Sequence, residues 1–134
     1  MKIRIKNNQR KITINKKDIA RIAEKILKIK GFENAELSIL FTGKRNICAL
    51  NKKFRNINRP TDVLAFSMRE GEDAGLHPEL LGDVVICPEI AQGEIYLCLV
   101  HGILHLLGFD DSTDKKHSIM KREQSRILRQ VTQK

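Results

Sequence analysis

The longest apolar segment of the chain runs from Ile95 to Leu107, and only two histidines and one glycine interrupt it. A helix that is apolar nearly all round is a buried helix, because none of its sides is suited to water. The segment is too short to cross a bilayer, which takes about 20 apolar residues. We therefore predict a central buried helix over Glu94–Leu107, with the rest of the chain arranged around it.

Patterns on either side of this segment predict a mixed order of strands and helices. Alternating or β-branched runs indicate strands, and apolar residues three or four apart indicate helices. Strands are expected at Lys2–Lys6, Lys11–Asn15 (after a turn at Asn7–Asn8), Ala35–Phe41, Asp62–Ser67 and Asp83–Cys87. Further helices are expected at Asp18–Lys30, closed by Gly31, at Lys44–Phe54, and from a cap at Ser112 or Thr113 to about Gln130, with Arg69–Leu81 as a loop. This order predicts one α+β domain over residues 1–134 in three layers, a small mixed β-sheet of about four strands packed with helices.

Two histidines in the apolar segment carry the strongest chemical signal. His101 and His105 are four residues apart, so a helix places both imidazoles on one face, as it does to bind a metal ion. Gly108 is suited to end the helix, and the chain can then return Asp111 to the same ion. Three protein ligands leave a position open for water, which is the arrangement of a catalytic site. We expect one ion, Zn2+ or another first-row divalent metal; the alternative is a pair of core histidines bonded to the backbone.

Neighbouring residues offer competing assignments. Cys98 precedes His101 by three residues, but three ligands on one continuous helix seldom converge, so we expect Cys98 in the core. His117 lies in a polar, lysine-rich stretch and is expected at the surface. Metallopeptidases with this ligand spacing have a general-base Glu directly after the first histidine, where this chain has Gly102, which argues against a peptidase. Asp110 is the nearest alternative base, although a carboxylate at a helix end often only caps the helix or orients a ligand.

Charge is unevenly distributed along the chain, whose net charge is +9. Residues 1–60 carry 17 Lys and Arg against 4 Asp and Glu, residues 61–111 carry 1 against 10, and residues 112–134 carry 7 against 2. Basic flanks suit a polyanion such as RNA, and an acidic middle suits a metal, although solvated lysine surfaces give the same balance. Aromatic side chains are few and Trp is absent, so stacking surfaces for bases are expected to be scarce.

Targeting signals and cysteine usage indicate the cytoplasm. The N-terminal residues MKIRIKNNQRK lack the apolar stretch of a signal peptide. The three cysteines, Cys48, Cys87 and Cys98, are odd in number and scattered, which fits a reducing compartment better than a disulfide framework. We therefore expect a cytoplasmic protein without a membrane partner.

A second motif, taken with the histidine segment, resembles a known family. Residues 50–66, LNKKFRNINRPTDVLAF, place basic side chains before a turn at Pro60, and arginine there suits phosphate binding. The chain resembles the YbeY family of bacterial metal-dependent endoribonucleases, which are rRNA maturation factors. The matching residues of the metal motif are His101, Gly102, Leu104, His105, Leu106, Gly108, Phe109 and Asp110. Those of the second motif are Asn51, Phe54, Arg55, Arg59, Pro60, Thr61, Asp62, Val63, Leu64 and Phe66, and Leu81–Ile86 matches a family strand.

The resemblance implies a role for Arg55 and shows where this chain departs from the family. Arg55 is implied to be the catalytic or substrate-holding arginine near the metal. Asp111 stands where the family has its third histidine, and Ala65 and Ser67 replace the usual serine and proline. Aspartate is an established metal ligand that makes the site less positive. Three roles for Asp111 remain open: a direct ligand, a ligand through water, or only a helix cap.

Together these features predict a single-strand-specific, metal-dependent endoribonuclease. Arg55, His101 and His105 are the expected catalytic residues, and His101, His105 and Asp111 the expected metal ligands. The resemblance implies action on single-stranded RNA in rRNA 3′-end processing and ribosome quality control, with the ribosome as partner. The nucleophile is either a metal-activated water or a ribose 2′-hydroxyl. Two alternatives remain, a ribosome- or RNA-binding protein with a structural metal and a metal-dependent hydrolase of another substrate.

Overall fold

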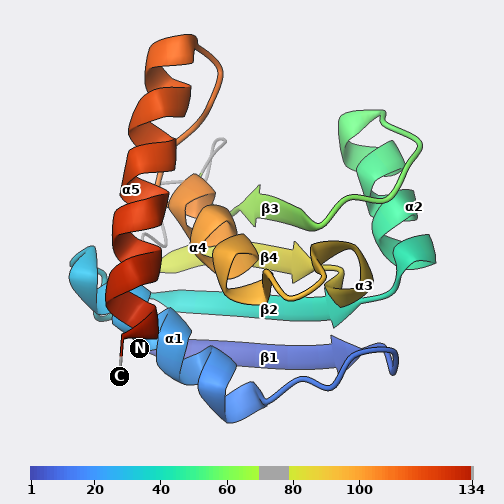
Figure 1. Cartoon of the computed structure of the whole chain (residues 1–134), viewed down its shortest axis with the longest axis horizontal. Helices are drawn as coiled ribbons and strands as arrows, with labels where there is room; N and C mark the ends of the chain where they lie inside the picture. Colours follow the sequence, from blue (N-terminus) through green and yellow to red (C-terminus); the bar gives the residue numbers. More distant parts are fainter. Residues whose placement is uncertain (70–78, 134) are drawn as a thin grey trace.

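The computed structural model describes residues 1–69 and 79–133, which form one β-sheet with helices on both of its faces (Figure 1). Along the chain the elements are β1 (Lys2–Asn8), α1 (Lys16–Ile29), β2 (Glu36–Thr42), α2 (Lys44–Arg55), β3 (Val63–Ser67), β4 (Leu80–Ile86), α3 (Pro88–Ala91), α4 (Ile95–Leu106) and α5 (Asp114–Thr132). None of the described helices is both long and apolar enough to cross a membrane.

The sheet has the strand order β1-β2-β4-β3 and contains both strand directions. β1, β2 and β4 are parallel neighbours, whereas β3 runs antiparallel to β4. In the middle of the sheet, Ile5 lies beside Ile39, which lies beside Val84. Parallel neighbours need a crossover connection, and α1 supplies it between β1 and β2. The result is the predicted mixed sheet, with β3 as one of its edge strands.

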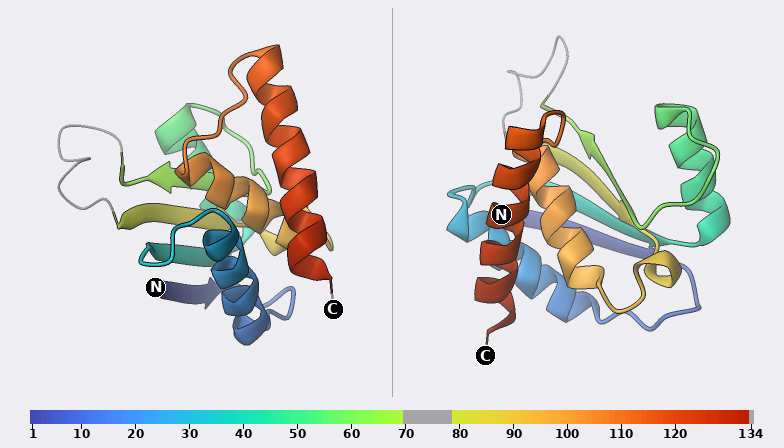
Figure 2. Two further views of the ribbon diagram at one scale, coloured as in Figure 1. Left: turned by 90° about the vertical axis from the view of Figure 1, so that its left-hand side faces the viewer. Right: turned by 45° about the horizontal axis from the view of Figure 1, so that its top comes forward.

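The sheet separates two apolar cores, because side chains along a strand point alternately to its two faces. The larger core lies beneath α1, α4 and α5, and the smaller one lies beneath α2 on the opposite face (Figure 2). Strand residues buried in the larger core are Leu37, Ile39, Phe41, Leu81, Val84 and Ile86. The smaller core consists of Ile47, Leu64, Val85 and Cys87. This arrangement confirms the predicted three-layer α+β fold, and it places α2 and α4 on opposite faces of the sheet.

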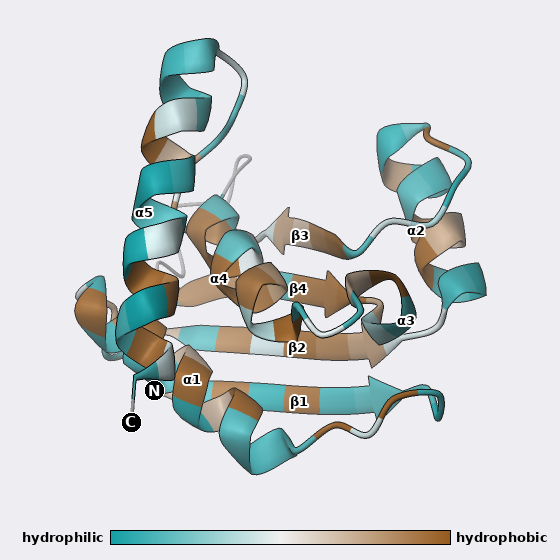
Figure 3. Cartoon of the chain, viewed as in Figure 1, coloured by the Kyte–Doolittle hydropathy of each residue, from teal (hydrophilic) through white to brown (hydrophobic). Residues whose placement is uncertain are grey.

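α4 is the central helix of the larger core, as its apolar sequence predicts (Figure 3). Gly102 allows this helix to lie close to the sheet, because a Cβ atom at this position would lie only 2.6 Å from Val84 Cγ1. Protein interiors are too densely packed to admit such an atom without displacing its neighbours. The two histidines of α4 are only partly buried, so the helix presents them at the edge of the core.

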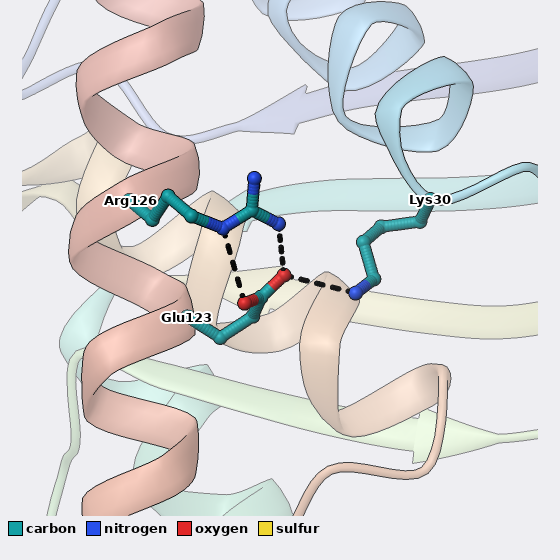
Figure 4. A network of polar contacts seen from close by, with 3 residues as sticks. All are labelled: Lys30, Glu123 and Arg126. Atoms are coloured by element: carbon teal, nitrogen blue, oxygen red, sulfur yellow. Dashed lines mark hydrogen bonds and ion pairs between the residues drawn. The ribbon is translucent and has the colours of Figure 1, made fainter.

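A three-residue polar network joins α5 to α1 (Figure 4). The Glu123 carboxylate accepts hydrogen bonds from Arg126 and, at 2.9 Å, from Lys30 Nζ. The Arg126 hydrogen bond, with a smaller contribution from Lys30, lowers the pKa of Glu123 to about 2. Lys30 Nζ also lies 4.8 Å from the centre of the Phe109 ring, a cation–π contact. The network therefore connects both helices to the segment that follows α4.

The predicted strand at Lys11–Asn15 is wrong. Gln9 turns the chain here, because its side chain bonds both the N–H and the C=O of Ile12. Asn15 then caps α1 by accepting a hydrogen bond from the Asp18 N–H at 3.2 Å. These local side-chain hydrogen bonds outweighed the alternating apolar pattern that favoured a strand. The predicted turn at Asn7–Asn8 is wrong as well, because both residues belong to β1.

One boundary and one short helix also differ from the predictions. The predicted loop Arg69–Leu81 ends too late, since Leu80 and Leu81 already pair in β4, and its residues 70–78 lie outside the described part of the chain. The short helix α3 was not predicted, although Pro88 occupies its first turn, where proline is favoured.

Candidate active site

His101 and His105 face each other at the C-terminal half of α4. Their Nε2 atoms are 3.0 Å apart, and the ring centres are 4.5 Å apart. The helix periodicity accounts for this, because residues four apart lie on the same face. The pair therefore directs two nitrogen atoms at one point.

His101 has a second partner on its other side. His101 Nδ1 lies 2.7 Å from the side-chain oxygen of Gln124 in α5. An amide oxygen can only accept, so the proton of neutral His101 is on Nδ1 and its Nε2 carries a lone pair. In the absence of a metal, His105 Nε2 donates a hydrogen bond to this lone pair. A divalent cation between the two nitrogens would take the place of that proton, and ligand histidines commonly have outer partners such as Gln124.

The charge state of His105 also suits a metal ligand. Burial lowers its pKa, and His101 lowers it further. Arg55 acts in the same direction, whereas Asp111 and the Phe109 backbone raise the pKa. Because the neutral imidazole is the form that binds metals, a lowered pKa keeps His105 ready for a cation at neutral pH.

A glycine ends α4 and turns the chain back toward the histidines. Gly108 has φ of 103°, in the region that favours glycine. The Phe109 N–H bonds to Leu104 O at 3.0 Å and the Gly108 N–H to His105 O at 3.1 Å, the two bonds of a Schellman motif. This turn places Asp110 and Asp111 beside the end of the helix.

The two aspartates have different surroundings. Asp110 accepts hydrogen bonds from the backbone N–H and the hydroxyl of Ser112, and these bonds lower its pKa. The cap of α5 is Thr113, whose hydroxyl accepts from Lys116 N at 3.1 Å. Asp111 is therefore not the helix cap, and in residues 1–69 and 79–133 its carboxylate has no hydrogen bond or ion pair.

Asp111 lies beside the histidines without completing a closed ligand set. It lines a cavity of about 190 Å³ together with His101, His117 and Gln124. Over the described ranges, no three His, Cys, Asp or Glu side chains are arranged to hold a metal ion. His117 is exposed, as predicted, but it borders the same cavity.

Arg55 reaches the histidine side of the sheet from the opposite layer. A cavity of about 240 Å³ is lined by Arg55 from α2, by Ala65 and Ser67 from β3, and by His105, Leu106, Gly108, Phe109 and Asp110. The cavity thus spans the edge strand between α2 and α4. Buried Asn51 holds the chain after α2 by donating from Nδ2 to Arg59 O at 2.9 Å. In the part of the chain that the structure describes, Arg55 has no carboxylate partner.

Cys98 is a core residue, as predicted. Its thiol is buried and lies 3.7 Å from Asp62 Oδ2. Burial, followed by the nearby Asp62 charge, raises the pKa of Cys98 to about 12. The thiol therefore stays protonated at neutral pH, whereas a metal ligand has to be the thiolate.

Gly102 gives a structural reason for the missing peptidase base. Its position faces Val84 of the sheet, with no room for a side chain, so a glutamate could not be accommodated there without moving α4. Sequence reasoning missed Gln124, although one signal was available. Gln124 shares the helix spacing of the buried residues Met120, Ile127 and Val131, and a polar residue on an apolar helix face often has a specific partner.

The chain is similar over most of its length to one described family. Residues 4–132 match the family model of endoribonuclease YbeY. A protein of that name from Syntrophotalea carbinolica is 39% identical over 81% of this chain and 79% of its own length. Another, from Pelotomaculum thermopropionicum, is 37% identical over 96% of this chain and 95% of its own length. The solution structure of a Thermotoga maritima protein has a TM-score of 0.61 and 28% identity, covering 96% of this chain and 88% of that one.

Proposed function

Because this chain belongs to the endoribonuclease YbeY family, we propose that it is a metal-dependent endoribonuclease that cleaves single-stranded RNA. One observation carries the proposal: Arg55 and His105 line the same cavity, which brings an arginine to the converging imidazoles. The proposal assigns residues 1–134 to one catalytic domain in the cytoplasm. It includes rRNA 3′-end processing and ribosome quality control with the ribosome as partner, for which the family resemblance and the basic flanks are the support.

His101 and His105 would hold the metal, with Asp111 as third ligand and Zn2+ or another first-row divalent cation as the single ion. When bound, such an ion acidifies a water molecule and polarises a phosphate oxygen. Three features support this ligand set: the converging Nε2 atoms, the outer partner of His101 and the unpaired Asp111 carboxylate beside His101 in the described ranges. An aspartate in place of a neutral histidine lowers the net positive charge of the site.

Arg55 would bind the phosphate that is cleaved. A guanidinium has donors in a planar fork that matches two phosphate oxygens, and it stays charged at any physiological pH. Attack on a phosphodiester increases the negative charge on the phosphorus oxygens, so a fixed cation stabilises the transition state more than the ground state. Asn51 keeps the end of α2 in place and thereby positions Arg55.

Asp110 is a poor general base, although it borders the same cavity. Its oxygens already accept two hydrogen bonds from Ser112, which lower its pKa and its affinity for a proton. Its assigned role is therefore to shape the turn that carries Asp111. The nucleophile is either a water molecule or a ribose 2′-hydroxyl.

A cleavage assay with three substrates tests the proposal. Purified protein is incubated with single-stranded RNA, the matching RNA duplex and casein, in EDTA and after addition of Zn2+ or Mn2+. We expect cleavage of the single strand alone, abolished by EDTA and restored by metal. Cleavage of casein would favour a hydrolase of another class. Metal-independent RNA binding without cleavage under any metal would favour the RNA-binding alternative.

Two variants on α2 provide the matched control. Arg55→Ala is expected to reduce cleavage by about 100-fold or more with a much smaller loss of RNA affinity, because its proposed role is in the transition state. Lys52→Ala removes an exposed charge from the same helix and is expected to weaken binding only slightly. Equal losses of binding and cleavage in Arg55→Ala would reduce Arg55 to a docking residue. The variant with both His101→Ala and His105→Ala, purified in parallel, reports any contaminating nuclease.

A further inference from the structure

Phe54 is an aromatic residue that the proposed chemistry does not use. Its side chain is 57% exposed, the largest exposure among the large apolar residues of the described ranges. The other phenylalanines are covered: Phe41 is buried, Phe32 and Phe109 lie beneath Arg69 and Lys30, and Phe66 lies behind Phe54. The chain was expected to have few stacking surfaces, and Phe54 is the exposed exception.

The Phe54 ring packs against a second aromatic ring. The Phe66 ring of β3 contacts it edge to face, with centres 5.1 Å apart and an angle of 64° between the rings. Phe66 in turn packs against the smaller core beneath α2. Asn51 and the left-handed Asn56 close the end of the helix just beyond Phe54. A ring with this support loses little conformational entropy when a ligand covers it.

The surroundings of Phe54 are strongly basic. Residues 51–59 contain Lys52, Lys53, Arg55 and Arg59 and no acidic residue. Lys53 Nζ lies 5.3 Å from the centre of the Phe54 ring, and Arg55 is the next residue along the chain. An exposed ring among cations complements a ligand that combines flat π-systems with negative charges, which describes single-stranded nucleic acid. Within residues 51–59, all of them described, Ile57 is the only other large apolar side chain that is exposed, which gives a protein partner little area to bury.

We propose that Phe54 stacks on a base of the RNA strand whose phosphate lies at Arg55. This inference rests on the proposed function, because it takes Arg55 as the site of the phosphate. Phe54 contacts Phe66 of β3, and Arg55 lines the cavity with Ala65 and Ser67, the residues on either side of Phe66. The base and the phosphate therefore belong to neighbouring nucleotides of a strand that crosses the edge strand β3. Bases inside a duplex are already stacked on both faces and cannot cover Phe54. The ring therefore provides a physical basis for selecting single strands.

The absence of Trp from the chain allows a direct test of stacking. Phe54→Trp places a single indole at the proposed site, and base stacking quenches indole fluorescence. The titration is done in EDTA with a short single-stranded RNA, its duplex, and a ribose-phosphate chain of equal length without bases. We expect saturable quenching by the single strand and little by the other two. Ile29→Trp, also at an exposed apolar position on a helix, is the control and should not be quenched by any of them.

A second variant measures the contribution to affinity. Phe54→Leu keeps an apolar side chain over Phe66 but removes the aromatic face. We expect its affinity for single-stranded RNA to fall roughly tenfold and its affinity for duplex RNA to stay unchanged. Thermal unfolding of both variants, compared with that of the parent protein, checks that the fold is retained.

The outcomes separate this inference from the proposed function. Equal quenching by the base-free chain, or wild-type affinity in Phe54→Leu, would overturn the stacking role. Cleavage of single strands without quenching would overturn this inference alone. Quenching of Phe54→Trp in a protein that never cleaves RNA would support base stacking and overturn the proposed enzyme.

Discussion

The side-chain oxygen of Gln124 accepts a hydrogen bond from His101 Nδ1 at 2.7 Å, and this contact connects α5 to the histidine pair of α4. It fixes the orientation of the His101 ring and leaves Nε2 free to face His105, 3.0 Å away. α5 therefore contributes to the site through a neutral residue that orients His101.

Replacing Gln124 should weaken metal binding. Gln124→Leu leaves His101 Nδ1 without an acceptor, and we expect a loss of about 10- to 100-fold in Zn2+ affinity. Gln124→Glu should bind Zn2+ at least as tightly as the parent, because a carboxylate is a stronger acceptor of the Nδ1 proton. Competition with a chelating dye measures both. Gln130→Leu, on an exposed position of the same helix, should match the parent protein; parent-like affinity in Gln124→Leu would show that His101 needs no such support.

Asp111 can be tested as a ligand by removing its charge. If it binds the metal directly, Asp111→Asn should lower metal affinity well over tenfold, and Asp111→His should retain the metal, because imidazole can fill the same position. Thr113 caps α5, so a capping effect does not confuse the comparison. Asp114→Asn removes a nearby exposed charge as the control. A metal titration of Asp111→Asn that overlays the parent curve would remove Asp111 from the ligand set.

Gly102 should be intolerant of any side chain. A methyl group there meets Val84 Cγ1 at 2.6 Å, and the crowding outweighs the better helix propensity of alanine. We expect Gly102→Ala to lower the free energy of unfolding in urea by about 1–2 kcal/mol. Ser118→Ala, at an exposed position of α5, should change it by less than about 0.5 kcal/mol. Equal stability of the two variants would mean that α4 does not depend on close contact at Gly102.

The Glu123 network should stabilise the fold in a pH-dependent way. The pKa of Glu123 is lowered from 4.5 to about 2, so the folded state favours the charged form. The stabilisation is therefore complete above pH 4.5 and is lost as the pH falls toward 2. At pH 7, Glu123→Gln should lower the free energy of unfolding by about 1 kcal/mol, a value that allows for solvent screening. Urea unfolding of both proteins should show that the difference between their free energies of unfolding shrinks as the pH falls through this range. A difference that stays constant with pH would show that the variant loses packing and not an ionic interaction.

Much of the site could be anticipated from local patterns. The apolar segment and its two histidines indicated α4 and their shared face, and Gly108 indicated the turn that brings Asp111 back. These features depend on helix periodicity and on hydrogen bonds between residues that are close in sequence. The same local reasoning failed at Lys11–Asn15, where side-chain bonds from Gln9 and Asn15 replaced the strand that the alternation favoured.

By itself, the sequence determined the three-layer class, the histidine pair and the glycine that ends its helix. Only the tertiary structure decided that Gln124, 23 residues from His101, is its partner, and that Arg55 reaches the histidines across the edge strand β3. It also decided that Phe54 stands exposed on Phe66. Local elements follow from backbone geometry and periodicity, which act over a few residues, whereas contacts between distant segments follow from how the layers pack.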